Sequence, residues 1–551
     1  MRADTGVELI PAPRTVRMTG GKLHLRDDLG VLADRELRGA WPLLTDILAT
    51  RLGLQLYPGR DHGAVLRLQF DPDHAADGYQ LDITAIAGAA RIQIVSGGLA
   101  GALSGLRTLQ QLLGQRAFRA TPISGAVLEL PMLRIADAPR FGHRGVLLDV
   151  ARHFLPKDQV MRFIDIASMH KINVLHLHLT DDQGWRFQVR AYPRLTEIGG
   201  WRRESQLGSS RSTLFDGEPH GGYYTQDDLR EIVEFARTRG VRVVPEIDVP
   251  GHSQAAMAAY PELAAGSERL EVWTRWGLNQ HVLDTSEHVV AFYCTVLDEL
   301  VEIFDSETIC LGGDEVATQE WLDNPSTRAQ AHALGLDEVD ELLPWFIGRL
   351  AERLRGHGRR VSVWDEVGGA RVPADVIINS WRGYRGGLDA LREGRDIVVC
   401  NEHELFLNHR AAPGLDEPAP VGTVQSVEDV YQFEPVNIEV EEATTESAAG
   451  SVLGAQAQVW REQLPDARRT DFATYPRLCA LAEVFWSPRE RRDWQDFSAR
   501  LSTHVRRLEA CGVDFRPLDG PRPWHQRPNI PGWPQRFDDL GTLVSAPYGE
   551  R

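Results

Sequence analysis

Short apolar runs rich in β-branched residues recur through the middle of this chain, and helical or loop segments separate them. Runs of this length and composition predict buried strands. The eight runs are GVLLDVAR (145–152), NVLHLHLTDD (173–182), VRVVPEID (241–248), TICLGGDE (308–315), VSVWDE (361–366), VIINSW (376–381), DIVVCNE (396–402) and SVLGAQAQVWRE (451–462). Eight successive strand–crossover units are typical of a closed parallel sheet, so we predict an α/β fold with a (β/α)8 TIM barrel over residues 141–490.

The segments on either side of the predicted barrel follow other patterns. Within residues 1–140, YQLDITAI (79–86) and ARIQIVSGG (90–98) alternate apolar and polar positions as half-buried strands do. This alternation predicts a smaller α+β domain before the barrel. Residues 491–551 begin with a helical pattern over 494–510 and continue as a tail rich in proline and tryptophan. We expect this last segment to pack on the barrel.

The composition excludes several classes of protein. The chain has 551 residues, of which 42% are hydrophobic and 25% charged, as in ordinary globular domains. Its net charge of −18 and its lack of a basic patch argue against a nucleic-acid partner. The N-terminus lacks the apolar core of a signal peptide, and no run of about 18 apolar residues occurs, so we expect no membrane span. The five cysteines are scattered and form no CxxC pair, which fits a cytoplasmic protein without disulfides. No pattern indicates the oligomeric state.

Polar and aromatic residues end each of the eight predicted strands. In a parallel barrel the C-terminal strand ends meet at one face, and that face holds the active site. The residues gathered there are Arg152, Asp181, Asp182, Asp248, Asp314, Glu315, Trp364, Asp365, Glu366, Trp381, Asn401, Glu402, Trp460 and Glu462, with His252 close in sequence. One acid after a strand is more often a helix cap or a solvated loop residue. Eight coincident strand ends favour a site, and Gly312 and Gly313 would leave room there for a ligand.

The residue types at this face predict a carbohydrate ligand. Tryptophan faces stack on the C–H faces of a pyranose, while carboxylates and arginine hydrogen-bond its hydroxyls. His176 and His178 share one face of a strand, but a third ligand at suitable spacing is missing, so we expect no metal. The chain also lacks the motifs of serine hydrolases, Walker-type phosphate sites and dinucleotide-binding folds, so we expect no cofactor.

Six stretches then resemble one known family. They are RGVLLDVARHFLP (144–156), INVLHLHLTDDQGWR (172–186), PEIDVPGHS (245–253), LGGDEV (311–316), VWDE (363–366) and VWREQL (459–464). In this order they resemble the motifs of family-20 glycoside hydrolases, the β-N-acetylhexosaminidases, and residues 1–140 resemble that family's α+β domain. The resemblance implies removal of terminal β-linked GlcNAc, or GalNAc, from glycans or chitooligosaccharides.

The resemblance also implies a mechanism. In that family the 2-acetamido oxygen of the sugar attacks C1 and forms an oxazolinium intermediate, with retention of configuration. Glu315 would be the general acid and then the base that activates water. Asp314 would orient and polarise the acetamido N–H. Asp181 and His252 would form a hydrogen-bonded chain towards Glu315 that helps to set its pKa.

Substrate-binding roles follow from the same resemblance. Arg152 would bind the hydroxyls at C3 and C4, for which a guanidinium fork is suited. Glu462 would accept hydrogen bonds from O4 or O6, and Asp248 would support the loop that carries His252. The walls of the sugar pocket and of the acetamido methyl group would be Trp364, Trp381 and Trp460.

One stretch departs from the family pattern. After the seventh strand the family has a tyrosine and, two residues later, an aspartate that binds a sugar hydroxyl, whereas this chain has Phe406 and Asn408. Phenylalanine has no hydroxyl to donate to the acetamido oxygen, and such a contact is worth about 3 kcal/mol. Either another donor substitutes, with Tyr384 and Tyr431 as candidates, or activity is reduced, or the preferred substrate differs.

Three alternatives remain open at this point. Asn408 with its basic neighbours His409 and Arg410 would tolerate an anionic group such as a 6-sulfate on GlcNAc. A glycosidase of another family would use two classical carboxylates, for example Glu315 with Glu366. A sugar-binding protein that has lost catalysis would also carry this set of residues.

Overall fold

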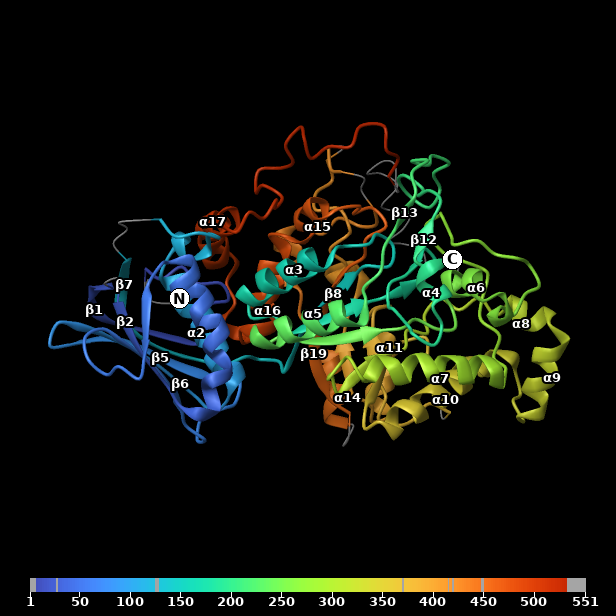
Figure 1. The fold of residues 1–551 in the computed structure, drawn as a ribbon, viewed down its shortest axis with the longest axis horizontal. Coiled ribbons are helices and arrows are strands. Elements are labelled where there is room, and N and C mark those ends of the chain that lie inside the picture. The colour runs from blue at the N-terminus through green and yellow to red at the C-terminus, as the bar shows by residue number, and fades with distance from the viewer. Residues whose placement is uncertain are drawn as a thin grey trace.

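The eight predicted strands form a closed parallel barrel, as the sequence pattern predicts (Figure 1). The computed structural model describes residues 6–25, 28–123, 128–368, 371–414, 416–418, 421–446 and 450–532. The barrel strands are β8 (His143–Asp149), β9 (Val174–His178), β14 (Arg242–Glu246), β15 (Thr308–Cys310), β16 (Arg360–Trp364), β17 (Ile377–Ser380), β18 (Ile397–Val399) and β19 (Val452–Val459). Around the barrel they follow the order β14, β15, β16, β17, β18, β19, β8, β9.

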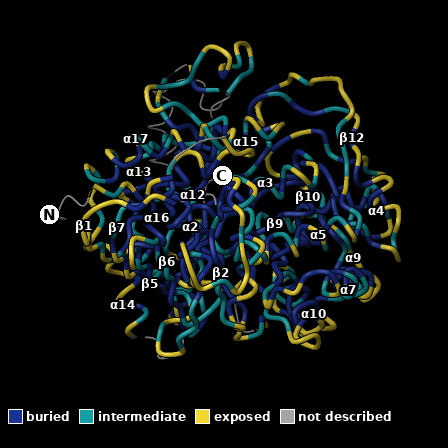
Figure 2. The backbone as a smooth tube through the Cα atoms, turned by 60° about the vertical axis from the view of Figure 1, so that its left-hand side comes forward, coloured by how far each residue is buried: buried dark blue, intermediate teal, exposed yellow. Residues whose placement is uncertain are grey.

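Amphipathic helices cover the outside of the barrel. They include α3 (Lys157–Met169), α5 (Gln226–Thr238), α7 (Glu287–Val301), α10 (Leu342–Gly356), α11 (Tyr384–Arg392) and α16 (Arg477–Trp486). Helix α5 begins at a capping box, in which the Thr225 hydroxyl accepts from the Asp228 amide and the Asp228 carboxylate accepts from Thr225. The apolar faces of these helices and the strands form one continuous core, which is the dark centre of Figure 2.

A seven-stranded mixed sheet forms the N-terminal domain. Its strands are β1 (Thr15–Leu25), β2 (Asp28–Ala33), β3 (Gln55–Pro58), β4 (Val65–Phe70), β5 (Tyr79–Ile86), β6 (Ala89–Ser96) and β7 (Leu128–Asp137), in the order β1-β7-β5-β6-β4-β2-β3. The alternating pattern over 79–86 places Tyr79, Leu81 and Ile83 in the core, as predicted. Helix α2 (Leu99–Leu112) packs on the sheet and faces the barrel.

Buried ion pairs join this domain to the barrel. Asp165 of α3 lies 2.6 Å from Arg107 of α2 and 2.7 Å from Arg51, and all three side chains are largely buried. Lys171, just after α3, lies 3.0 Å from Asp137 at the end of β7. Removing one partner of such a pair would leave a buried charge uncompensated, which costs about 3 to 5 kcal/mol. These contacts therefore fix how the two domains dock.

The C-terminal segment returns across both domains. The predicted helix over 494–510 is confirmed as α17 (Trp494–Ala510), and Arg500 on it donates to the main-chain carbonyl of Leu9 at 2.6 Å. Glu483 of α16 accepts from the amide of Ala12 at 2.8 Å. Residues near the start of the chain are thus held by residues near its end. Of the predicted tail, residues 533–551 lie outside the described part.

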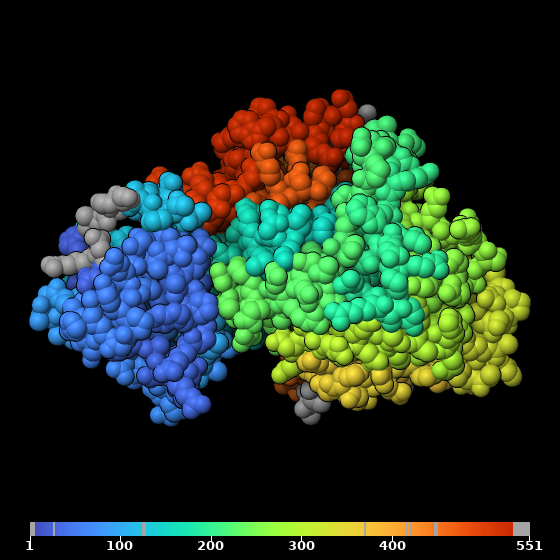
Figure 3. Space-filling model, viewed as in Figure 1, coloured from blue at the N-terminus to red at the C-terminus, as the bar shows by residue number. Residues whose placement is uncertain are grey.

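The described tail is the red segment at the top of Figures 1 and 3, and it contacts loops near the mouth of the barrel. Arg527 donates to the carbonyl of Gln463 at 3.2 Å, beside the predicted site residue Glu462. The carbonyl of Pro531 accepts from the amide of Ser209 at 2.9 Å. The tail therefore ties the loop after β19 to the long insertion after β9. No helix within the described ranges is long and apolar enough to cross a membrane.

A buried histidine pair lies between the barrel and α17. The Nε2 atoms of His170 and His504 are 2.8 Å apart, His170 Nδ1 donates to the carbonyl of Ile166 at 2.9 Å, and Arg507 donates to His504 Nδ1 at 3.2 Å. With both histidines neutral, every ring nitrogen has a hydrogen-bond partner, because a single hydrogen lies between the two Nε2 atoms. Burial lowers the pKa of His170 to about 4 and holds the pKa of His504 well below its usual value.

We expect this pair to make the protein less stable in acid. Between pH 6.5 and pH 4 the unfolded chain binds protons at these histidines while the folded chain does not, so the free energy of unfolding falls as the pH falls. For His170 the loss reaches about 3 kcal/mol at pH 4, at 1.36 kcal/mol per pKa unit. Urea unfolding between pH 4.5 and 7.5 measures it. In His504→Gln the free energy of unfolding should fall less as the pH is lowered, whereas His24→Gln, at an exposed histidine, should behave like the wild type. An equal decrease in all three proteins would contradict the prediction.

Candidate active site

The C-terminal ends of the barrel strands surround a cavity of about 190 Å³. Its lining residues are Arg152, Asp314, Glu315, Trp364, Trp381, Glu402, Phe406, Asn408, His409, Trp460 and Glu462. The predicted residues Asp181, Asp248 and His252 do not line the cavity but lie buried behind it. The strand ends therefore bring the predicted residues together in two layers, with the second supporting the first.

A strained turn presents Asp314 and Glu315. It follows β15 with three residues in left-handed conformation, Gly312 (φ 66°), Gly313 (φ 93°) and Glu315 (φ 51°). A Cβ atom on Gly312 would overlap the Asp248 carboxylate, and one on Gly313 would overlap Val367. The two glycines thus leave space for the side chains of Asp248 and Val367. The expectation that they leave space for a ligand is wrong. A left-handed conformation is rare for glutamate and is typical of functional sites.

Asp248 holds this turn in place. One carboxylate oxygen accepts from the amide of Gly313 at 3.1 Å. The main-chain carbonyl of Asp248 accepts from the Ser253 hydroxyl at 3.2 Å, next to His252. Burial and the neighbouring Asp314 raise the pKa of Asp248 well above its usual value. Asp248 therefore links the loop of His252 to the turn of the two acids, without facing the cavity itself.

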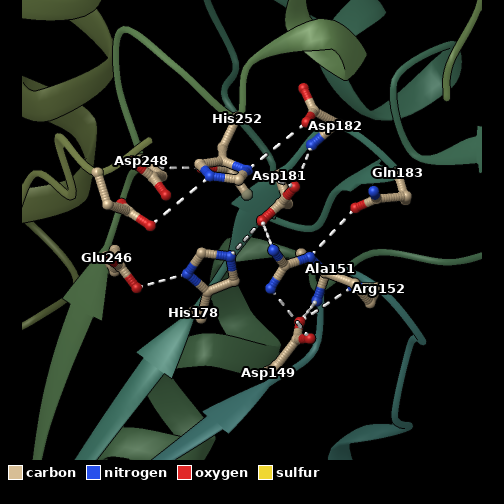
Figure 4. Close-up of polar contacts among 12 residues, drawn as sticks. Asp149, Ala151, Arg152, His178, Asp181, Asp182, Gln183, Glu246, Asp248 and His252 are labelled. Carbon is tan, nitrogen blue, oxygen red and sulfur yellow. Dashed lines mark hydrogen bonds and ion pairs between the residues drawn. The ribbon is translucent and has the colours of Figure 1, made fainter. Parts of the chain in front are cut away.

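His252 lies between four carboxylates (Figure 4). Its Nε2 atom is 3.6 Å from both Asp314 and Glu315, and its Nδ1 atom is 3.3 Å from Asp181 and 3.5 Å from Asp182. Burial disfavours a charge on this ring, but Asp181 and Asp314 outweigh it and raise the pKa well above the usual value. We infer an imidazolium that shares its charge between Asp181 and the two acids that line the cavity.

Asp314 and Glu315 differ in their surroundings. Burial and the carboxylates of Glu366 and Glu315 raise the pKa of Asp314 to about 7, although His252 opposes the shift. One oxygen of Asp314 faces His252, and the other is buried with no hydrogen-bond partner among the described residues. A buried carboxylate oxygen without a donor is costly. It is therefore suited to accept a hydrogen bond from a ligand.

Arg152 is fixed on three sides. It lies 2.8 Å from Asp181 and 3.4 Å from Asp149, and it donates to Gln183 at 3.2 Å. Its guanidinium also lies 5.0 Å from the ring centroid of Trp460. Asp149 was not singled out from the sequence, yet its carboxylate also accepts from the amide of Arg461, which joins the first barrel strand to the last. These contacts leave Arg152 little freedom before a ligand arrives.

Three tryptophans and one phenylalanine form the apolar walls. Trp364 and Trp460 lie 6.0 Å apart at 51°, and Phe406 stacks on Trp381 at 6.0 Å and 18°. Indole N–H groups of two walls are bound from behind, Trp364 by Glu246 and Trp381 by Glu366, both at 2.9 Å. Phe406 therefore occupies a wall of the cavity, where the family pattern places a tyrosine.

The tyrosines that we expected to replace this hydroxyl lie elsewhere. Tyr384 donates to the carbonyl of Glu434 at 2.7 Å, and Tyr431 donates to Glu483 at 3.0 Å. Neither lines the cavity, so the expectation that one of them faces the substrate is wrong. Trp460 Nε1 is buried, and the described residues offer it no acceptor. This indole N–H is available to a ligand.

The geometry argues against two of the alternatives, a classical pair of Glu315 with Glu366 and a pocket for a 6-sulfate. Glu366 does not line the cavity, and its two oxygens bind Trp381 and Arg382, so it is poorly placed to act opposite Glu315. His409 lines the cavity, but burial and nearby basic groups lower its pKa to about 3, so it carries no charge at neutral pH. The positive charge that motivated a 6-sulfate pocket is therefore absent from His409.

The buried histidines and acids also form groups of metal-ligand type. Within the described chain, His176, Glu246 and Cys310 make one such group, and His178, Glu246 and Asp248 make another. Both ring nitrogens of His178 face carboxylate oxygens, which leaves no lone pair for a metal. These buried histidines and acids could have been recognised in the sequence as polar residues at inward-facing positions of buried strands.

Comparison with known families then places the two domains. The description "Glycosyl hydrolase family 20, catalytic domain" matches residues 141–489, and "Glycosyl hydrolase family 20, domain 2" matches residues 6–138. A β-hexosaminidase of Porphyromonas gingivalis is 33% identical over 520 residues. This match covers 93% of the chain but only 64% of that relative's length.

Solved structures share the whole architecture. The family-20 exo-β-N-acetylglucosaminidase of Vibrio harveyi, solved in complex with N-acetylglucosamine, gives a TM-score of 0.79 at 28% identity, over 93% of this chain and 78% of that one. The β-N-acetylhexosaminidase of Streptomyces coelicolor gives a TM-score of 0.79 at 28% identity, over 95% and 98%. The likeness therefore includes the N-terminal domain as well as the barrel.

We expect Gly312→Ala to disrupt the site more than a matched glycine substitution elsewhere. Gly335 has nearly the same φ (68°) but open space where a Cβ would lie, so Gly335→Ala carries only the cost of left-handed alanine, about 1 to 2 kcal/mol. Gly312→Ala carries that cost and also displaces Asp248. Thermal unfolding and ligand binding should show a larger loss for Gly312→Ala. Equal losses would contradict the assigned role of this turn.

Proposed function

The chain belongs to glycosyl hydrolase family 20, the β-N-acetylhexosaminidases, and from this premise we propose that it removes terminal β-linked GlcNAc, or GalNAc, by substrate-assisted catalysis. As a member of that family it is a glycoside hydrolase. One observation supports the mechanism above all others. Asp314 and Glu315 share His252 at 3.6 Å on one side of the cavity, and Glu366, the expected partner of Glu315 in a classical pair, does not line it.

In the first step the acetamido oxygen attacks C1 and the glycosidic C1–O bond breaks. Glu315 donates its proton to the departing oxygen. The Asp314 oxygen that has no partner accepts from the acetamido N–H, which increases the nucleophilicity of the carbonyl oxygen and stabilises the positive charge that develops. His252, held by Asp181, balances the two neighbouring carboxylates as the proton leaves.

In the second step water opens the oxazolinium ring. Glu315, now a carboxylate, takes a proton from the water as its oxygen attacks C1 from the side of the departed group. The acetamido group is restored, and the sugar leaves with its original configuration. Arg152 and Glu462 would hold the hydroxyls of the sugar at one end of the cavity. Trp364, Trp381 and Trp460 would enclose its apolar faces.

A plain N-acetylhexosamine fits the cavity better than a 6-sulfated one. Glu402 and Glu462 both line the cavity, and His409 is uncharged. Arg410 lies in the lining of a separate small cavity of about 30 Å³ rather than in this one. An anionic substituent would therefore meet carboxylates at close range, which opposes its binding.

We expect Glu315→Gln to lower the release of phenol from an aryl β-N-acetylglucosaminide at least about a hundredfold, because it removes the acid and base. Steady-state kinetics of wild type and variant measure the change. Fluorination of the acetamido methyl group should lower kcat progressively in the wild type, since it weakens the internal nucleophile. A thiazoline mimic of the intermediate should inhibit the wild type strongly. No inhibition and no effect of fluorination would contradict substrate assistance and favour a classical pair of carboxylates.

Phe406→Tyr should restore the hydroxyl that the family pattern contains. We expect kcat/KM for the same glycoside to rise at least about tenfold. The upper limit is roughly 160-fold, which corresponds to about 3 kcal/mol. Phe406→Leu is the control, because it alters the wall without adding a donor, and it should lower kcat/KM. An unchanged kcat/KM in Phe406→Tyr would indicate that another donor, such as Trp460 Nε1, already serves the acetamido oxygen.

A further inference from the structure

Glu246 is the last residue of β14, and its carboxylate is buried and does not line the cavity. Three donors bind it, His178 Nδ1 at 2.5 Å on one oxygen and Trp364 Nε1 at 2.9 Å and Cys310 Sγ at 3.4 Å on the other. His176 Nε2 also lies 3.1 Å from the first oxygen, without hydrogen-bond geometry. A carboxylate that accepts this many hydrogen bonds is held in its ionised form. Glu246 is thus a fixed negative charge inside the barrel.

His178 must carry hydrogens on both ring nitrogens. Its Nδ1 faces Glu246, and its Nε2 faces Asp181 at 2.9 Å (Figure 4). Carboxylate oxygens accept and do not donate, so two hydrogen bonds require two N–H groups and hence an imidazolium. Burial disfavours this charge, but Glu246 and Asp181 outweigh it and raise the pKa of His178 well above its usual value.

The charges then alternate from the barrel interior to the cavity. Glu246 faces His178, His178 faces Asp181, Asp181 faces His252, and His252 faces Asp314 and Glu315. Asp181 also lies 2.8 Å from Arg152. Asp181 is therefore in contact with three cations, and one of them, His178, owes part of its charge to Glu246.

A second set of contacts fixes Glu246 from the opposite end of the barrel. Gln456 donates to His176 Nδ1 at 3.0 Å, so the hydrogen of His176 is on Nε2, the atom that faces Glu246. The carbonyl oxygen of Gln456 lies 3.3 Å from His143, which lines a cavity of about 210 Å³ at that end. Glu246 is therefore in contact with His176 on this side of the barrel as well as with His178 and Trp364.

We propose that Glu246 is a positioning residue of the active site, which acts through His178 on the Asp181–His252 pair and through Trp364 on the wall of the sugar cavity. This inference rests on the proposed function, because it assigns Glu315 as the acid that His252 assists. It also accounts for the two histidines of HLHL, which the sequence pattern left without a role. Both histidines of the pair face one buried carboxylate.

Glu246→Gln keeps the size of the side chain and removes its charge. His178 then has one carboxylate instead of two, and it no longer requires hydrogens on both nitrogens. Asp181 loses part of its cationic support, so His252 is held less firmly beside Glu315. Donation of the proton to the leaving oxygen should suffer most, since this step depends on the placement of Glu315 and His252.

The experiment compares a good and a poor leaving group, 4-nitrophenyl and 4-methoxyphenyl β-N-acetylglucosaminide. For Glu246→Gln we expect kcat/KM to fall about tenfold for the first and about a hundredfold for the second, because a poor leaving group needs the proton more. In the double variant with Asp181→Asn, the loss should not exceed that of Asp181→Asn alone, since both changes interrupt one chain.

A matched control separates positioning from stability. Asp165→Asn removes a largely buried, ion-paired carboxylate at the domain boundary, away from the cavity. It should lower Tm while leaving the ratio between the two substrates at the wild-type value. Thermal unfolding of every variant ensures that kinetics are measured below Tm. His178→Gln is the second variant, and it should change the same ratio in the same direction.

The remaining outcomes are decisive as well. Equal losses for both substrates, or additive losses in the double variant, would overturn the positioning role of Glu246. If neither Glu246→Gln nor His178→Gln folds, the pair is a requirement of the barrel and the proposal is also overturned. Wild type that turns over neither substrate would instead count against the proposed function, so the two failures are distinguishable.

Discussion

Ionised side chains lie in the interior of this barrel, where a charge without a partner of opposite sign would cost several kcal/mol. Asp149 is paired with Arg152, and Asp181 faces both Arg152 and His178. The same condition holds at the domain boundary, where Asp165 bridges Arg107 and Arg51. The requirement that buried charges be paired therefore determines both where the domains dock and how the cavity is supported. It also explains why the supporting layer is made of acids and histidines instead of aliphatic residues.

Much of the fold could be predicted from the spacing of apolar residues. Parallel strands that are buried on both faces appear as short apolar runs, and each of the eight runs overlaps a barrel strand. The strand ends likewise predicted a common face, because parallel strands place their C-termini together. Strand boundaries were less predictable, since TICLGGDE contains only three residues of strand, Thr308–Cys310, before the turn begins.

The contacts that depend on three-dimensional packing could not be predicted. The glycines before Asp314 read as space for a ligand, yet Asp248 occupies that space. Tyr384 and Tyr431 were reasonable donors by residue type, but their hydroxyls bind Glu434 and Glu483. Sequence spacing shows which residue types are present near a strand end. It does not show which way a side chain faces after the loop has turned, and this orientation decides whether a residue meets the sugar or supports its neighbour.

The contact between the two ends of the chain has a consequence for biosynthesis. Leu9 and Ala12 are held by Arg500 and Glu483, and residues up to Pro531 contact loops near the mouth of the barrel. A ribosome that adds about 5 to 20 residues per second needs roughly 25 to 100 seconds to pass from Ala12 to Arg500. During that time Leu9 and Ala12 lack these two partners, although the neighbouring Ile10 can already pair with Gln111 of its own domain. The nascent chain must therefore keep Leu9 and Ala12 accessible until α17 has been synthesised and can contact them.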